Sequence, residues 1–286
     1  SGDGGVGGAV IIYGGAPVAG NRTITLSETA DGTAMSGLAA HIFENPVAAA
    51  NGSSLGYKVE FLGDTRAGDG VGDIAISYFS DKTPVVQEDN AVYVLRGRTA
   101  TGASGISFTP LRATDLRVEN PSTEASTSFG MELASIDDQN SDGFRDLVIS
   151  AHEQSRGHVW IVNGPADYLT NIVGTAANGS RFGASVANAR QQAGSDVNGD
   201  GLEDLVIAGG TPGSTTGVSL FLWFGGAIPV GDVLASSAAS TIGAAPEFSN
   251  SVFGGAPNTL QLIWAGDVNN DGLEDLAWTD WQAGAD

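Results

Sequence analysis

The chain of 286 residues is strongly acidic, with 33 Asp and Glu residues against 12 Lys and Arg residues and a formal net charge of −21. This charge argues against nucleic-acid binding, which needs clustered basic side chains, and no apolar run approaches the roughly 18 residues of a membrane-spanning helix. Because the chain contains no cysteine, a secreted protein of this sequence would be stabilised by its core and by bound metal, not by disulfides.

Glycine, with 42 residues, divides the chain into short apolar segments that predict β-strands. The first segment is residues 8–15, which end in two glycines. Four related units follow, each with the same order of parts: an aromatic-glycine dipeptide, an acidic loop, an apolar run, a variable loop and a second apolar run that ends in glycine. The cores of these units are residues 55–97, 129–164, 182–226 and 253–286.

The repeated unit predicts an all-β fold, a β-propeller of about four four-stranded blades. The continuous apolar character of the runs indicates sheets that are buried on both faces. Weaker segments, such as residues 24–26 and 108–111, are the expected fourth strands. The last unit lacks its glycine-ending strand, and residues 8–15 have the pattern of that strand. We therefore expect residues 1–286 to form one domain whose two ends share a blade; the alternative is a segment of a longer array.

A nine-residue acidic loop recurs in the units, as DQNSDGFRD from Asp138, DVNGDGLED from Asp196 and DVNNDGLED from Asp267. Oxygen-bearing side chains stand at loop positions 1, 3, 5 and 9, and glycine stands at position 6. Ca²⁺ takes about six to eight oxygen ligands, and glycine permits the sharp turn that gathers them. The loops therefore predict three calcium sites. An EF-hand is excluded, because position 12 falls within an apolar run and supplies no glutamate.

The Phe-Gly dipeptides, the DxNxDGxxD loops and the apolar runs after them resemble the FG-GAP repeats of integrin α-subunit propellers and of many bacterial extracellular proteins. In that family the side chains at positions 1, 3, 5 and 9 and the main-chain carbonyl at position 7 bind Ca²⁺. The resemblance therefore implies three sets of ligands: Asp138, Asn140, Asp142, Phe144 and Asp146; Asp196, Asn198, Asp200, Leu202 and Asp204; and Asp267, Asn269, Asp271, Leu273 and Asp275.

The acidic loop of the first unit departs from this pattern, since the stretch from Asp64 to Asp73 carries one extra residue. Asp69 and Asp73 keep their spacing, whereas Asp64 is displaced and Arg66 brings a positive charge near the cation. The resemblance implies a fourth and weaker calcium site here, formed by Asp64, Asp69, Val71 and Asp73.

The variable loops between the second and third strands are the expected ligand-binding face. The metal loops join the first and second strands, so the variable loops lie on the opposite face of the predicted disc, and loops on a rigid scaffold commonly bind partners. Four side chains there are candidate contacts: Tyr78, Phe79, His152 and Trp281. For each of them, packing against a neighbouring residue is the simpler role.

These features favour a calcium-stabilised extracellular or cell-surface module for binding or adhesion, without catalysis, whose partner is a protein or a glycan. The calcium is expected to be structural, because the loop fills the shell of the ion with protein oxygens. One alternative is a carbohydrate-active enzyme, a lyase or hydrolase, on the same scaffold. The other is an architectural repeat unit of a large surface or fibrous protein, in which copies contact one another.

Overall fold

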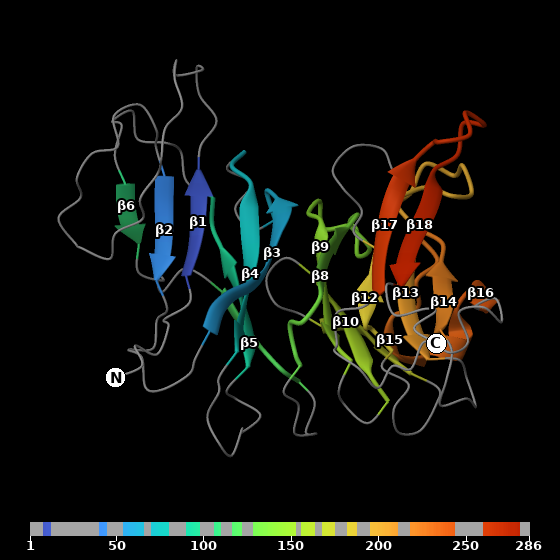
Figure 1. Cartoon of the computed structure of the whole chain (residues 1–286), viewed down its shortest axis with the longest axis horizontal. Coiled ribbons are helices and arrows are strands. Elements are labelled where there is room, and N and C mark those ends of the chain that lie inside the picture. The colour runs from blue at the N-terminus through green and yellow to red at the C-terminus, as the bar shows by residue number, and fades with distance from the viewer. Residues whose placement is uncertain are drawn as a thin grey trace.

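The computed structural model describes residues 8–12, 40–44, 54–65, 70–79, 90–97, 106–109, 116–121, 128–152, 156–163, 168–174, 182–187, 195–210, 218–243 and 260–280. Within these residues the fold is all-β, and the single helical element is the short 3₁₀ turn η2 (Ala235–Ser237). No helix in this part of the chain has the length and apolar character needed to cross a bilayer. The strands form five sheets, which lie side by side in Figure 1.

Three of the sheets contain the predicted unit of four antiparallel strands, and we call them blades 1, 2 and 3. Blade 1 consists of β3 (Ser54–Gly63), β4 (Asp73–Phe79), β5 (Ala91–Leu95) and β7 (Leu116–Glu119). Blade 2 consists of β8 (Leu133–Ile136), β9 (Asp146–Ala151), β10 (His158–Val162) and β11 (Tyr168–Val173). Blade 3 consists of β12 (Ser185–Val186), β13 (Leu205–Gly210), β14 (Val218–Trp223) and β16 (Ser240–Gly243).

A pair of antiparallel strands lies at each end of this array. The C-terminal half-sheet is β17 (Leu260–Gly266) with β18 (Asp275–Asp280), and these strands flank the last acidic loop as the first two strands of a blade do. The N-terminal half-sheet is β1 (Gly8–Ile12) with β2 (Ala40–Glu44). β1 lies against β3 of blade 1, and β17 lies against β12 of blade 3.

Two inserted strands leave their own blade and pair with the sheet before it. β6 (Ile106–Thr109) lies between β5 and β7 in the chain and pairs in parallel with β2. β15 (Gly231–Leu234) lies between β14 and β16 and pairs in parallel with β11, the fourth strand of blade 2. Because equivalent insertions pair with β2 and β11, β2 has the position of a fourth strand and β1 that of a third strand.

These pairings correct two sequence predictions. The segment expected as the fourth strand of blade 1, residues 108–111, does not supply it, since residues 108 and 109 lie in β6; that place belongs to β7, whose Val118 is buried in the core. Among the described residues the two ends do not share a blade, because β1 pairs with β2 while Figure 1 places β1 and β18 at opposite ends of the molecule. The described residues form an open array of blades instead of a closed ring. Residues 24–26 lie outside the described residues.

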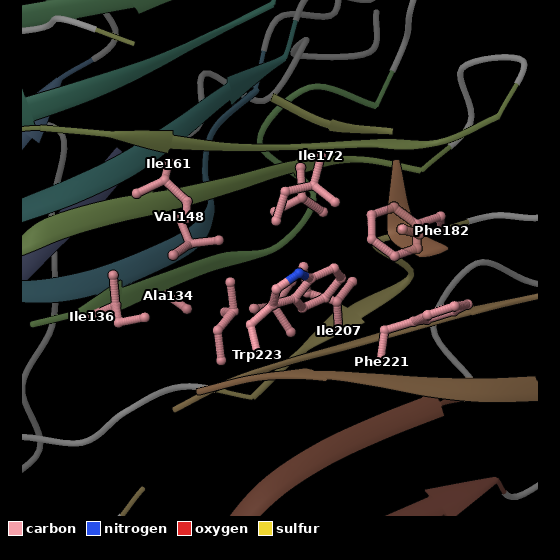
Figure 2. Close-up of a cluster of buried hydrophobic side chains, with 13 residues drawn as sticks. Ala134, Ile136, Val148, Ile161, Ile172, Phe182, Ile207, Phe221 and Trp223 are labelled. Carbon is pink, nitrogen blue, oxygen red and sulfur yellow. The ribbon is translucent and has the colours of Figure 1, made fainter. Parts of the chain in front are cut away.

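The second and third strands of the blades bury side chains on both faces, as the continuous apolar runs predicted. In β13, Leu205 and Ile207 pack against blade 2, while Val206 and Ala208 pack against the C-terminal half-sheet. This alternation follows from the two-residue period of side chains along a strand. Figure 2 shows the core between blades 2 and 3, where Trp223 of β14 lies among side chains from both blades.

The Phe-Gly dipeptides join neighbouring blades. Phe129 is fully buried and makes an edge-to-face contact with Trp160, with ring centroids 5.4 Å apart. Gly130 has φ +91°, and a Cβ there would lie 3.0 Å from Val92 and 3.3 Å from Ser77 of blade 1. Gly183 stands in the same relation to Ser150 and Val159 of blade 2. Glycine is needed because the backbone of one blade touches the preceding blade. The dipeptide Phe253-Gly254 lies outside the described residues.

Candidate metal centres

The three regular acidic loops share one hydrogen-bond frame, which begins at the aspartate of position 1. One carboxylate oxygen of that residue accepts the main-chain N–H of position 5, and the other accepts the N–H of position 6. For Asp138 the two distances are 3.1 and 2.6 Å. They are 3.2 and 2.7 Å for Asp196 and 3.0 and 2.8 Å for Asp267. The repeated sequence therefore produces a repeated geometry.

Backbone conformation explains the small residues of these loops. Position 6 is Gly143, Gly201 or Gly272, with φ between +86° and +92°. Position 4 is also left-handed, with φ of +62°, +78° and +61° at Ser141, Gly199 and Asn270. Glycine adopts this region without strain, and asparagine tolerates it better than most residues. The turn that results brings the polar side chains of positions 1, 3 and 5 to one side of the loop.

The polar side chains at positions 3 and 5 contact each other. The asparagine Nδ2 donates to the aspartate Oδ2, at 2.9 Å in Asn140–Asp142, 2.8 Å in Asn198–Asp200 and 3.0 Å in Asn269–Asp271. The other aspartate oxygen accepts the N–H of position 7 at 2.9 Å in each loop. Two of the implied ligand side chains thus already lie together in every loop.

The aspartate at position 9 opens the second strand and holds the loop to it. Its Oδ2 accepts the N–H of position 2, at 2.8 Å for Asp146, 2.8 Å for Asp204 and 2.9 Å for Asp275. Asp204 Oδ1 also accepts the N–H of Gly225, the glycine that ends the third-strand run. Burial raises the pKa of Asp204, although these two N–H groups favour its charged form. The glycine at the end of the run therefore has a structural role.

Asp146 has the most unusual environment of these carboxylates. Its Oδ1 is buried and has no hydrogen-bond partner among the described residues; Gly164, the counterpart of Gly225, lies outside them. Burial, together with the nearby charges of Asp142 and Asp138, raises its pKa to about 7, against the hydrogen bond from the Gln139 N–H and the charge of Arg145. A buried carboxylate oxygen beside two further carboxylates fits a bound cation, because the cation would offset both the burial and the repulsion.

The loop of blade 1 keeps the position-6 hydrogen bond of this frame despite its extra residue. Asp64 Oδ2 accepts the N–H of Gly70 at 2.7 Å, as position 1 does from position 6 in the other loops. Asp73 is buried and accepts the N–H and the hydroxyl of Thr65 and the N–H of Gly97. Asp64 therefore accepts the N–H of the glycine at position 6 even though the stretch carries one extra residue. Asp69 and Arg66 lie outside the described residues.

These loops hold the right atoms for a hard cation but do not form a finished coordination sphere. Each regular loop brings carboxylate and amide oxygens together in one turn, and such oxygens are the ligands that Ca²⁺ prefers. Within the described ranges, however, no group of three or more His, Asp or Glu side chains is arranged as a metal site. Several of the carboxylate oxygens accept main-chain N–H groups instead.

Neighbouring acidic loops contact one another through position 8, which the sequence analysis did not identify. Arg145 of the second loop forms ion pairs with Glu203 of the third loop and with Asp137, each with a shortest distance of 2.6 Å. The N–H of Glu274 in the last loop donates to the carbonyl of Asp196 at 3.2 Å. The sequence does carry a signal for this contact, because position 8 is positively charged in one loop (Arg145) and negatively charged in the next (Glu203). These contacts place the second, third and last loops on one side of the array.

The candidate ligand residues divide by burial. Tyr78 is 4% exposed and packs edge-to-face on Tyr93, and His152 is 2% exposed, so neither presents a surface to a partner. Phe79 is partly buried and lies edge-to-face with Tyr57, which is 46% exposed, with ring centroids 5.2 Å apart. Trp281 lies outside the described residues.

A cavity of about 10 Å³ between blades 1 and 2, lined partly by Thr65 and Asn163, has room for one water.

Comparisons with known proteins relate the chain to integrin α chains. It is 28% identical over 144 residues to integrin alpha-4 of Xenopus laevis, which covers 49% of this chain and 13% of that protein. It is 31% identical over 171 residues to integrin alpha-5 of the same species, which covers 54% of this chain and 14% of that protein. The chain thus spans about a seventh of the length of these relatives. No family model matches the sequence.

Proposed function

We propose that this chain is a calcium-stabilised extracellular module for binding or adhesion, built from blades of the integrin-propeller type, with no catalytic role. The observation that carries the proposal is the acidic loop frame, which recurs between the first two strands of blades 1, 2 and 3 and of the C-terminal half-sheet. The similarity to integrin α chains supports it independently. An extracellular location fits the millimolar free Ca²⁺ found outside cells.

Calcium would be held by the oxygens of positions 1, 3, 5, 7 and 9 in each loop. Position 5 is the clearest ligand to test, because Asp142, Asp200 and Asp271 are exposed and their exchange for asparagine keeps the size of the side chain while it removes the charge and one of the two acceptor oxygens. At a free calcium concentration of about 100 times Kd, each site would stabilise the fold by about 2.7 kcal/mol. Three or four sites would together rival the stability of a typical domain, which favours a structural role for the metal.

A partner would bind on the side of the array opposite the calcium loops. Among the described candidates, the Phe79–Tyr57 pair at that end of blade 1 combines an exposed aromatic ring with a rigid strand position. Exposed aromatic rings are common anchors for both proteins and sugars. A glycan array and a panel of extracellular matrix proteins, probed with the wild type and with Tyr57→Ser, would test this. Binding that Tyr57→Ser leaves unchanged would exclude this pair as the contact.

The first experiment compares thermal unfolding in calcium and in EGTA and counts the bound ions by equilibrium dialysis. We expect a large fall in the unfolding midpoint in EGTA, and Asp200→Asn should remove one ion and part of the calcium-dependent stabilisation. The matched control is Asp232→Asn, the same exchange at an exposed strand residue outside the loops. An unfolding midpoint that does not change between calcium and EGTA would contradict the proposal.

A further inference from the structure

The third acidic loop differs from the other two regular loops at position 4. Its asparagine at position 3 is followed by glycine, Asn198-Gly199, whereas the corresponding pairs are Asn140-Ser141 and Asn269-Asn270. Asparagine is a chemically labile residue, and a following glycine has no side chain to obstruct the attack of its own nitrogen on the amide. Asn198 and Gly199 are both exposed. We infer that Asn198 is a site of spontaneous deamidation and that its isoaspartyl product breaks the turn of the third loop.

The reaction needs no reagent other than water. The main-chain nitrogen of Gly199 attacks Cγ of Asn198, so that a C–N bond forms while the Cγ–Nδ2 bond breaks. The proton of the attacking nitrogen leaves with Nδ2 as ammonia, and a succinimide ring remains. Water then opens the ring: cleavage of the new bond gives aspartate, and cleavage of the original peptide bond gives isoaspartate. In isoaspartate the main chain runs through Cβ and Cγ and is one atom longer.

Only surface hydrogen bonds restrain the reacting groups in the closed loop. The Gly199 N–H donates to Asp196 Oδ1 at 2.6 Å. The amide of Asn198 contacts Asp200 through both of its polar atoms, with Nδ2 donating to Oδ2 at 2.8 Å and Oδ1 accepting the main-chain N–H at 2.9 Å. Because residues 198–200 are exposed, a local opening that frees these groups costs much less than global unfolding. The folded chain therefore reaches the reactive arrangement.

Burial distinguishes Asn198 from another asparagine that precedes a glycine. Asn163 is followed by Gly164 in the sequence, but it is only 8% exposed, directly after β10. A buried amide is held by its surroundings and is shielded from the water that opens the succinimide, so Asn163 should react slowly. The sequence alone gives both asparagines the same susceptibility, and the structure separates them. The Asn-Gly pairs at residues 51–52 and 178–179 lie outside the described residues.

The additional main-chain atom of isoaspartate would lie inside the hydrogen-bond frame of the loop. Asp196 accepts the main-chain N–H groups of Gly199, Asp200 and Gly201. Asn198 stands between this acceptor and all three donors in the chain, so a longer main chain at Asn198 displaces the donors together. An ordinary aspartate at this position keeps the length of the main chain and adds one negative charge. The inference does not depend on calcium binding.

Peptide mapping of the folded chain tests the site. The wild type would be incubated in calcium at physiological temperature and mildly alkaline pH, with circular dichroism to confirm that it stays folded. Mass spectrometry and labelling by an isoaspartyl methyltransferase would locate the product. We expect Asn198 to react at least about tenfold faster than Asn140 and Asn163, because its loop opens locally. Equal rates at Asn198 and Asn140, or an Asn198 that reacts only in the urea-unfolded chain, would overturn the proposal.

Two reciprocal variants at position 4 serve as matched controls. Gly199→Ser should slow the reaction of Asn198 to the rate of Asn140, and Ser141→Gly should raise the rate of Asn140. Serine already occupies this position with φ +62° at Ser141. A Cβ at Gly199 would lie 3.1 Å from Cδ2 of Leu273, the end of an exposed side chain that can shift. Reaction rates that neither substitution changes would show that the glycine does not determine the site.

Thermal unfolding tests the effect of the isoaspartyl product on the loop. The deamidated fraction, separated by ion exchange, would be compared with Asn198→Asp, which has the same charge and a main chain of normal length. We expect a lower unfolding midpoint for the deamidated fraction. Repair of isoaspartate to aspartate by the methyltransferase should return the midpoint to that of Asn198→Asp. Equal midpoints before repair would contradict the inference that the product breaks the turn.

Discussion

Arg145 and Glu203 form a two-pronged ion pair between the acidic loops of blades 2 and 3, with Nη1–Oε1 at 2.9 Å and Nη2–Oε2 at 2.6 Å. Their side chains are only 20% and 13% exposed. Burial raises the pKa of Glu203, and Arg145 acts against this by stabilising the charged form. A guanidinium thus joins two loops that are otherwise rich in negative charge.

We expect Arg145→Ala to lower the free energy of unfolding by about 2–3 kcal/mol. Breaking a buried pair costs about 3–5 kcal/mol because it leaves a charge without a counter-ion, and the partial exposure of this pair reduces that cost. Arg117→Ala is the control, since the Arg117–Glu119 pair is more exposed and should contribute less than about 1 kcal/mol. Urea unfolding of both variants would measure the difference. Equal losses would show that Arg145 does not join the blades.

The close packing of Gly130 on blade 1 predicts that Gly130→Ala destabilises the chain by about 2 kcal/mol or more. The new Cβ would have a left-handed φ of +91° and a contact of 3.0 Å with Val92. Strained φ values cost about 1–3 kcal/mol, and the contact adds to that cost. Gly143→Ala is the control, because Gly143 has φ +92° with open space around it. The difference between the two variants in thermal unfolding isolates the contact between blades.

The frame of the first acidic loop predicts a fourth calcium ion. Asp64 receives the Gly70 N–H as position-1 aspartates do elsewhere, and Asp73 has the burial of a position-9 aspartate. We expect equilibrium dialysis to find four ions in the wild type and three in Asp64→Asn, with Asp232→Asn unchanged. A wild type that binds only three ions, all retained in Asp64→Asn, would show that this loop holds no calcium.

The environment of Asp146 predicts that the metal-free chain becomes less stable as the pH rises. Its carboxyl keeps a proton up to about pH 7 in the folded chain, whereas the ordinary value is 3.8. The folded state therefore binds more protons between these values, so the free energy of unfolding falls across this window. Urea unfolding in EGTA at about pH 5 and about pH 7.5 should show this fall in the wild type and a smaller one in Asp146→Asn.

Bound calcium should oppose this fall in stability with rising pH. A cation binds the charged carboxylate, so the proton and the ion compete for the same group. The calcium-dependent part of the stability should then grow as the pH rises toward about 7, which the same titration in excess calcium would reveal. An identical pH dependence with and without calcium would indicate that Asp146 does not bind the ion.

The repeated strands could be predicted from sequence because their signals are local. The apolar runs after the loops lie in β4, β9, β13 and β18, and the glycine-ending runs lie in β5, β10 and β14. The acidic turns could likewise be read from their aspartates and glycines. Each of these signals depends on neighbouring residues alone, and the structure confirms the strands in the predicted order.

The inserted strands and the arrangement of the ends could not be predicted in this way. β15 has mostly exposed residues and exists because it pairs with β11 of another blade, so its own sequence carries no apolar pattern. Residues 8–12 have a third-strand pattern, but that pattern does not specify which sheet lies beside them. The Arg145–Glu203 pair depends similarly on how two blades meet. The spacing of residues along the sequence predicts the strands within a unit, but it does not predict which units contact each other.

The pairing of β15 with β11 also affects how the chain folds during synthesis. The ribosome releases β11 well before β15. The outer edge of β11 therefore has no partner strand until most of blade 3 has been synthesised. Likewise, the edge of β2 that pairs with β6 has no partner until β6 has been synthesised. Open strand edges are sites of misassembly between nascent chains. We therefore expect the yield of correctly folded protein to depend on the rate of translation between these strands. It should also depend on chaperones that cover the unpaired strand edges.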